Sequence, residues 1–116
     1  MKKIAILACL KANNVCAGVS CLQAFYGRKA SFDRYQGEEL TLCAFLRCSQ
    51  CSQSDQSILS DKGMMEKLHR ILGCGVEVAH IGGCAKKSDG TPCAYMEQAA
   101  DFLSGQGVQI VWGTHG

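Results

Sequence analysis

The chain has 116 residues, of which 47% are hydrophobic and 19% charged, and its formal net charge is +2. This length and composition predict a single globular domain over residues 1–116 and exclude a disordered protein. The small net charge argues against nucleic-acid binding, and no segment approaches the roughly 20 apolar residues of a membrane span. The apolar segment that follows Lys2 and Lys3 is too short for a secretion signal, so we expect a cytoplasmic protein.

The first half of the chain predicts a strand, a helix and a second strand. Residues 4–8 are apolar throughout, which is typical of a buried parallel strand. Residues 17–29 show helical periodicity, and residues 40–46 form the second apolar segment. The apolar positions of this helix are Leu22, Phe25 and Tyr26.

A second helix and a third strand follow. Either Ser60 or Asp61 is suited to cap the helix, because both side chains accept hydrogen bonds from exposed backbone N–H groups. The helix ends near Gly73, and residues 76–81 form the third strand. The apolar positions of the helix are Met64, Leu68, Ile71 and Leu72.

The last helix and strand complete an alternating pattern. Thr91 and Pro92 predict a helix start, with threonine as N-cap and proline as first helical residue. The helix ends near Gly105, and residues 108–112 form the fourth strand. This order predicts a doubly wound, flavodoxin-like α/β domain with a four-stranded parallel sheet, strand order 2-1-3-4 and helices on both faces.

Most of the nine cysteines follow the predicted strands. In such a fold the carboxyl ends of the strands meet at one edge of the sheet, where ligands bind. Clustered cysteines in a cytoplasmic protein indicate metal binding or redox chemistry. The candidate metal ligands are Cys9, Cys16, Cys21, Cys48, Cys51, Cys84, Cys93 and His115.

One ion cannot take ligands directly from all four strand ends. Neighbouring strands are about 4.8 Å apart, whereas the sulfurs around a tetrahedral zinc lie within about 4 Å of one another. We therefore expect Cys9 and Cys84, on the two central strands, to share a site. Cys16 or Cys21 and the pair Cys48 and Cys51 would complete it, with His115 at the edge of the sheet.

The other cysteines and histidines have simpler interpretations. Cys43, within the second strand, and Cys74, at a helix end, are expected to be structural, because cysteine often packs as a small hydrophobic residue. His80 lies within the third strand and is expected in the core. His69 is expected on the exposed side of the second helix.

Nearly the whole chain resembles the CGGC-domain family, which is named for a central Cys-Gly-Gly-Cys. Here that pair reads Cys48-Ser49-Gln50-Cys51, and Ala17 stands where a proline often follows the second cysteine. The resemblance implies a small metal-binding α/β protein with no established reaction. It rests on Cys9, Cys16, Cys21, Cys48, Cys51, Cys84, Pro92, Cys93, Thr114 and His115.

The sequence therefore favours a metal-binding protein with zinc as the metal, and it leaves three alternatives to a zinc site. Zinc suits a closed Cys/His ligand set, and an iron–sulfur cluster suits ligation by thiolates alone. A thiol–disulfide redox protein would use Cys48 and Cys51 as a reversible dithiol. A metal sensor or carrier is a further interpretation. The residues indicate neither a substrate nor a protein partner.

Overall fold

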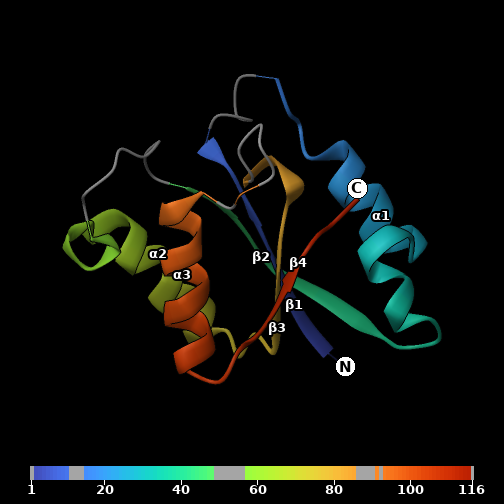
Figure 1. Cartoon of the computed structure of the whole chain (residues 1–116). Helices are drawn as coiled ribbons and strands as arrows, with labels where there is room; N and C mark the ends of the chain where they lie inside the picture. The colour runs from blue at the N-terminus through green and yellow to red at the C-terminus, as the bar shows by residue number, and fades with distance from the viewer. Residues whose placement is uncertain (1, 11–14, 49–56, 86–90, 92, 116) are drawn as a thin grey trace.

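The computed structural model describes residues 2–10, 15–48, 57–85, 91 and 93–115, which form a parallel sheet with helices on both faces (Figure 1). The strands are β1 (Lys2–Ala8), β2 (Leu40–Arg47), β3 (Val78–Ile81) and β4 (Gln109–Trp112). Their order is β2-β1-β3-β4, and each neighbouring pair is parallel. The predicted fold class and strand order are confirmed.

The helices divide between the two faces of the sheet. Helix α1 (Val19–Gly27) covers one face, and α2 (Lys62–Gly73) and α3 (Ala94–Gly105) cover the other (Figure 1). Short 3-10 helices occur at η2 (Ala30–Tyr35), η3 (Ile58–Ser60) and η4 (Gly83–Ala85).

Strand β1 supplies both halves of the core. Ile4 and Ile6 point to the α1 face, Ala5 and Leu7 point to the α2 and α3 face, and all four are fully buried. Burial of one large aliphatic side chain contributes about 1.5–3 kcal/mol. The unbroken apolar segment in the sequence therefore reflects a strand covered on both sides.

Strand β2 contains a β-bulge opposite β1. Leu42 pairs with Ile4, but Ala5 pairs with Ala44, so Cys43 is an extra residue. Cys43 and Ala44 consequently both pack on the α2 and α3 face, whereas Leu42 packs on the α1 face. A bulge of this kind redirects one side chain, while the residues after it continue to pair regularly with the neighbouring strand.

Helix α1 is shorter than the predicted residues 17–29. It begins after Gly18, whose φ of 79° is left-handed, and ends before Arg28, whose φ of 53° is also left-handed. Tyr26 does not join the apolar face as predicted, because it is 70% exposed and contacts only the edge of the Phe25 ring among the aromatic pairs described. Cys21 and Ala24 take that place in the core.

Asp61 is the cap of α2. Its Oδ1 accepts a hydrogen bond of 3.0 Å from the Met64 backbone N–H, and its Oδ2 accepts one from the Tyr95 hydroxyl. Such a cap contributes about 1 kcal/mol, and the Tyr95 contact also ties α2 to α3.

The predicted start of α3 at Thr91 and Pro92 is wrong. The helix begins at Ala94, and Cys93 occupies the N-cap position in an extended conformation. The Cys93 backbone N–H donates a 2.7 Å hydrogen bond to the Ala85 carbonyl, which holds Cys93 itself in its extended conformation beside η4. Thr91 therefore precedes the helix and Pro92 lies outside the described residues.

His80 is a buried polar residue with both ring nitrogens engaged, as expected for a core histidine. Its Nδ1 lies 2.9 Å from the Gly113 carbonyl, and its Nε2 lies 2.7 Å from the Tyr35 hydroxyl. Because a carbonyl only accepts, Nδ1 carries the proton and Nε2 accepts from Tyr35. Burial lowers the pKa of His80, since the charged ring would lose its hydration.

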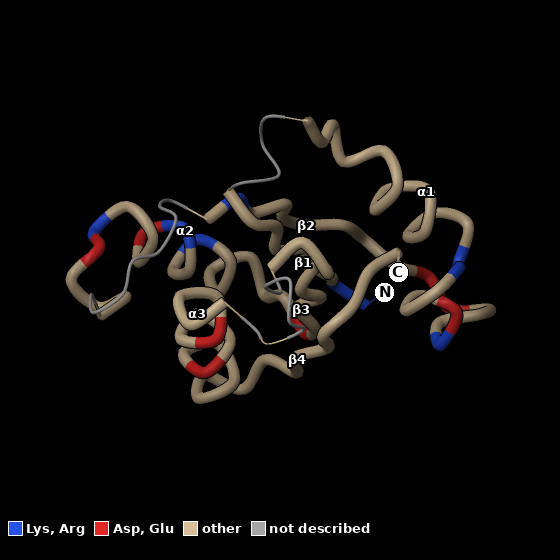
Figure 2. The backbone as a smooth tube through the Cα atoms, turned by 45° about the horizontal axis from the view of Figure 1, so that its top comes forward, with Lys and Arg blue, Asp and Glu red and all other residues tan. Residues whose placement is uncertain are grey.

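Basic and acidic residues occur together on α2 and in the segment after α1 (Figure 2). Among the described residues, no helix is both long enough and apolar enough to cross a membrane.

Substitution of Gly113 by alanine is expected to destabilise the protein by about 1–3 kcal/mol, because its φ of 150° disfavours L residues. The added Cβ would also collide with Ser31 Oγ. Thermal unfolding measures the effect. Gly105→Ala is the matched control. A Cβ added at Gly105 would have no described atom within 4 Å outside its own helix and chain neighbours, and alanine favours a helix. Equal melting temperatures for the two variants would contradict this assignment.

The lowered pKa of His80 predicts a pH-dependent stability. Below about pH 6.5 the unfolded chain binds a proton at this residue while the folded protein resists it, so the free energy of unfolding decreases as pH falls. Urea unfolding at pH 7.5, 6.5 and 5.5 measures the slope, which should be smaller in His80→Gln. The NMR signals of the His80 ring in the wild-type protein give a second test, and titration near pH 6.5 would refute the prediction.

Candidate metal centre

Cys9 and Cys84 meet at the carboxyl ends of the two central strands. Cys9 directly follows β1, and Cys84 lies in η4 just after β3. The Cys9 backbone N–H donates a hydrogen bond of 3.2 Å to Cys84 Sγ. Gly82 leaves room for this sulfur, because a Cβ there would lie 3.3 Å from Cys84 Sγ. The two cysteines therefore lie next to each other, as their places after the central strands imply, and a shared metal site stays a prediction.

Cys16 and Cys21 approach from the start of α1. Cys16 Sγ accepts a hydrogen bond of 3.3 Å from the Gly18 N–H, in the turn that precedes the helix. Cys21 is buried in the first turn, and its thiol donates to Thr114 Oγ1 at 3.4 Å. Thr114 is fully buried beyond β4, so this contact joins α1 to the far edge of the sheet.

The thiols of Cys9, Cys16, Cys21 and Cys84 are close enough to interact electrostatically. Burial raises the pKa of Cys84, and the charges that Cys9, Cys21 and Cys16 would carry as thiolates raise it further. The hydrogen bond from the Cys9 N–H acts in the opposite direction. We call this group the strand-end thiol cluster: Cys9, Cys16, Cys21 and Cys84.

Two further candidates border the cluster on the α2 and α3 side. Cys48 follows β2 directly, its N–H donates to the Ala8 carbonyl at 3.0 Å, and its side chain is buried in the core. Cys93 is half-buried beside Ala85 and packs against the same core. Both thus flank the ends of the central strands from the side opposite α1.

The remaining candidates are less well placed. His115 is exposed after β4, at the edge of the sheet as expected, and Cys51 lies outside the described residues. Within the described ranges, no three Cys, His, Asp or Glu side chains are grouped closely enough to hold one ion. The fold therefore gathers thiols at one edge without bringing them to ligand distances of a single metal.

Arg47 brings positive charge to the same edge. Its Nη2 donates to the Cys16 carbonyl at 3.2 Å, and its guanidinium lies 5.5 Å from the centre of the Phe45 ring. Nη1 is buried and has no hydrogen-bond partner among the described residues. A cation at this position offsets the negative charge that several thiolates would accumulate.

The donor chemistry fits a soft or borderline metal. Thiolates are preferred ligands of zinc and of iron–sulfur clusters, whereas magnesium and calcium select oxygen. The four cysteines of the cluster supply such donors, and a backbone N–H already points at one of the sulfurs. A hydrogen bond to a ligand atom, such as this one to Cys84 Sγ, orients metal ligands in proteins.

Comparison with known families identifies a domain that spans nearly the whole chain. A model of the CGGC domain matches residues 3–115. The chain belongs to the CGGC-domain family. The match covers all four strands and the strand-end thiol cluster of this CGGC domain. Neither the comparison with curated proteins nor that with solved structures gives a match.

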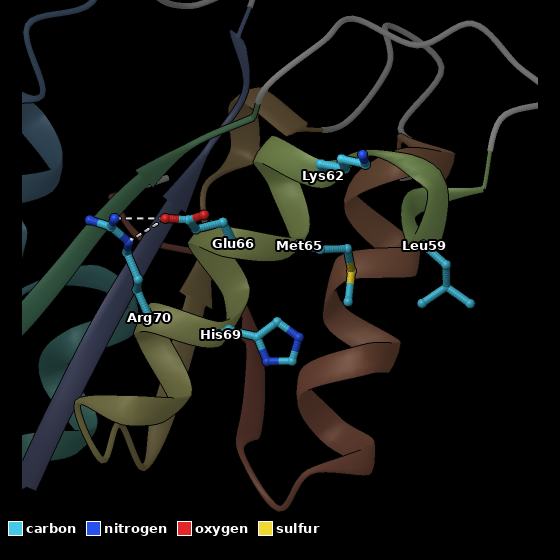
Figure 3. A pocket seen from close by; sticks show the side chains of 6 residues that line it. All are labelled: Leu59, Lys62, Met65, Glu66, His69 and Arg70. Atoms are coloured by element: carbon cyan, nitrogen blue, oxygen red, sulfur yellow. Dashed lines mark hydrogen bonds and ion pairs between the residues drawn. The ribbon is translucent and has the colours of Figure 1, made fainter.

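Sequence reasoning missed part of the surroundings of the thiols in this CGGC domain. Thr114 stood out only through the family resemblance, and its contact with Cys21 depends on the packing of α1 against the end of β4. Gly82 leaves room for Cys84 Sγ because it has no side chain, and the hydrophobic periodicity of the sequence does not reveal this role. An open cavity of about 540 Å³ on the outer side of α2 has no cysteine among the lining residues that the structure describes (Figure 3).

The raised pKa of Cys84 predicts slow alkylation. Because the thiolate is the reactive form, iodoacetamide labelling of Cys84 in the metal-free protein should reach its half-maximal rate at a higher pH than in the urea-unfolded chain. Mass spectrometry of the labelled peptides gives this midpoint, which differences in access do not move. Cys21→Ser should lower the midpoint by removing one repelling charge. Identical midpoints in folded and unfolded protein would contradict the assignment.

Proposed function

We propose that this CGGC domain binds a metal through the strand-end thiol cluster, with zinc as the favoured ion. The observation that carries the proposal is the contact between the Cys9 N–H and Cys84 Sγ, with the thiols of Cys16 and Cys21 close enough to affect the same group. Membership of the CGGC-domain family supports a metal-binding role.

The electrostatics of the cluster favour a bound cation. Without one, burial raises the pKa of Cys84, and thiolates at Cys9, Cys21 and Cys16 would raise it further. A divalent ion reverses this effect, because it stabilises thiolates and releases their protons. The cluster is therefore expected to exchange protons for metal as a unit.

The outer candidates would complete the ligand set. In this proposal Cys48 and Cys93 contribute from the side of α2 and α3, Cys51 from the segment after Cys48, and His115 from beyond β4. The backbone hydrogen bonds that place Cys48 beside Ala8 and Cys93 beside Ala85 support their nearness to the central strands. A cytoplasmic, reducing location would keep these thiols available.

An iron–sulfur cluster and a redox dithiol are the main alternatives. A cluster would span more than one mononuclear site and so suits thiols that approach from several elements. A redox role for Cys48 and Cys51 needs an accessible thiolate, and the burial of Cys48 at 3% exposure weighs against it. A sensor or carrier would use the same ligands with faster exchange of the metal.

The first experiment is elemental analysis and a visible spectrum of protein purified without oxygen. We expect about one or two equivalents of zinc and no visible bands. Cys9→Ser and Cys84→Ser should each weaken zinc binding by at least about tenfold, measured by competition with a chromophoric chelator. Cys74→Ser is the matched control, because Cys74 lies at the end of α2.

The outcomes separate the alternatives. Iron with equivalent sulfide and visible absorbance would replace zinc by an iron–sulfur cluster at the same residues. Protein without metal, and without affinity for zinc or iron when they are added to the reduced chain, would refute the proposal. Loss of zinc in the control to the same extent as in Cys84→Ser would show that the strand-end thiol cluster is not the site.

A further inference from the structure

Cys43 and Cys74 form a second pair of thiols outside the strand-end thiol cluster. The bulge in β2 turns Cys43 to the α2 and α3 face, and Cys74 is the C-cap of α2. Both residues line the same cavity, and Cys74 contributes to the raised pKa of the Cys43 thiol. Cys43 is half-buried and packs against the core, as expected for a structural cysteine, whereas Cys74 is exposed and does not pack as a small hydrophobic residue.

This pair lies towards the opposite end of the sheet from the strand-end thiol cluster. Helix α2 returns the chain to the amino end of β3, so its last residues lie near the start of the strands. Lys3, in the first part of β1, confirms this position, because its Nζ donates to the Cys74 carbonyl at 3.1 Å. The two groups of thiols are therefore separate sites.

A cavity of about 470 Å³ opens beside the two thiols, between β2 and α2. Its lining combines apolar side chains with the cationic side chains of Lys67 and Arg70, and no carboxylate is among the lining residues that the structure describes. Arg47 also lines the cavity, but its guanidinium contacts the Cys16 carbonyl and the Phe45 ring instead. Glu66 pairs with Arg70 at 2.7 Å from the outer side of α2 (Figure 3). The cavity thus offers a positively charged rim over an apolar wall and a dithiol.

We propose that Cys43 and Cys74 form a redox dithiol that reacts with small anionic disulfides bound in this cavity. Three observations support the proposal: the bulge that turns Cys43 towards α2, the position of both thiols in the lining of one cavity, and the cationic side chains of Lys67 and Arg70 in the same lining. The size of the cavity suits a peptide-sized ligand, and its charge selects carboxylate-bearing disulfides.

The reaction proceeds by two exchanges. The Cys74 thiolate attacks one sulfur of the bound disulfide, which forms a mixed disulfide and releases the first small thiolate. Cys43 then loses its proton and attacks Cys74 Sγ, which releases the second small thiolate and closes the Cys43–Cys74 disulfide. The small disulfide gains two electrons, the dithiol loses two, and the two thiol protons pass to the released thiolates.

The surroundings assign the order of the two cysteines. Cys74 is exposed and meets the ligand first, whereas Cys43 is half-buried against the core. Burial, and the neighbouring Cys74, raise the pKa of Cys43, so it remains protonated until Cys74 is engaged in the mixed disulfide. The nearby Lys3 ammonium acts in the opposite direction and favours the thiolate of Cys43 when it attacks.

The test uses the reduced full-length chain and oxidised glutathione, an anionic peptide disulfide. Combined trypsin and glutamyl endopeptidase digestion releases Cys43 on residues 40–47 and Cys74 on residues 71–77, each without another cysteine. We expect these two peptides to become linked, with a loss of about 2 Da from the reduced pair. In Cys43→Ser the reaction should stop at a glutathione adduct on Cys74.

Charge variants test the selectivity of the cavity. Arg70→Gln should slow oxidation by oxidised glutathione about threefold and leave the rate with the neutral bis(2-hydroxyethyl) disulfide unchanged. Lys62→Gln is the matched control, because it removes one positive charge from the start of the same helix, outside this cavity. Its two rates should equal those of the wild-type protein.

Several results would overturn the proposal. These are linkage of Cys43 or Cys74 mainly to other cysteines, a Cys74 adduct in the wild-type protein that never resolves, and equal effects of Arg70→Gln on both reagents. The outcome is independent of the metal proposal, because Cys74→Ser should abolish this disulfide while it retains zinc binding. Loss of both properties together would refute the separation of the two sites.

Discussion

The parallel pairing of β1 with both β2 and β3 is the constraint on which the rest of the structure depends. Residues 4–7 are fully buried on both faces, so β1 must be central and the helices must divide between the two sides. Parallel pairing then brings the carboxyl ends of these strands together. The thiol cluster is a direct consequence, because its cysteines follow strands or begin the helix that leaves β1.

The two ends of the sheet carry thiols in different surroundings. At the carboxyl end, several thiols would repel one another as thiolates, and a backbone N–H donates a hydrogen bond to one of the sulfurs. At the other end, two thiols line one cavity together with cationic side chains. The first arrangement suits a cation that neutralises thiolates together, and the second suits a reaction that joins two sulfurs covalently.

The apolar pattern was sufficient to predict the strand order, the division of the helices between the two faces of the sheet, and the proximity of Cys9 to Cys84. Hydrophobic segments determine which elements are central, and the right-handed crossover then leaves few topologies. Element ends were less predictable, because Gly18 and Arg28 adopt left-handed conformations that depend on local packing. Thr91 has the right chemistry for a cap, yet Cys93 is extended and occupies the N-cap position, so the helix begins later.

The site was predictable as a collection of ligands at one edge but not as a geometry. Contacts such as Cys21 with Thr114 join residues 93 positions apart, which no local pattern encodes. The pair of Cys43 and Cys74 was missed for a related reason. Alternation alone places Cys43 and Ala44 on opposite faces, and a bulge that puts both on one face becomes visible only in the register with β1.

That bulge also determines how β2 tolerates changes in length. Loss of one residue elsewhere in the strand would turn every following side chain to the opposite face. Deletion of Cys43 itself would leave Leu42 and Phe45 facing α1 and Ala44 and Leu46 facing α2 and α3, in a regular ladder with β1. The strand therefore contains one position at which a residue can be gained or lost through evolution while the core on both faces stays in register.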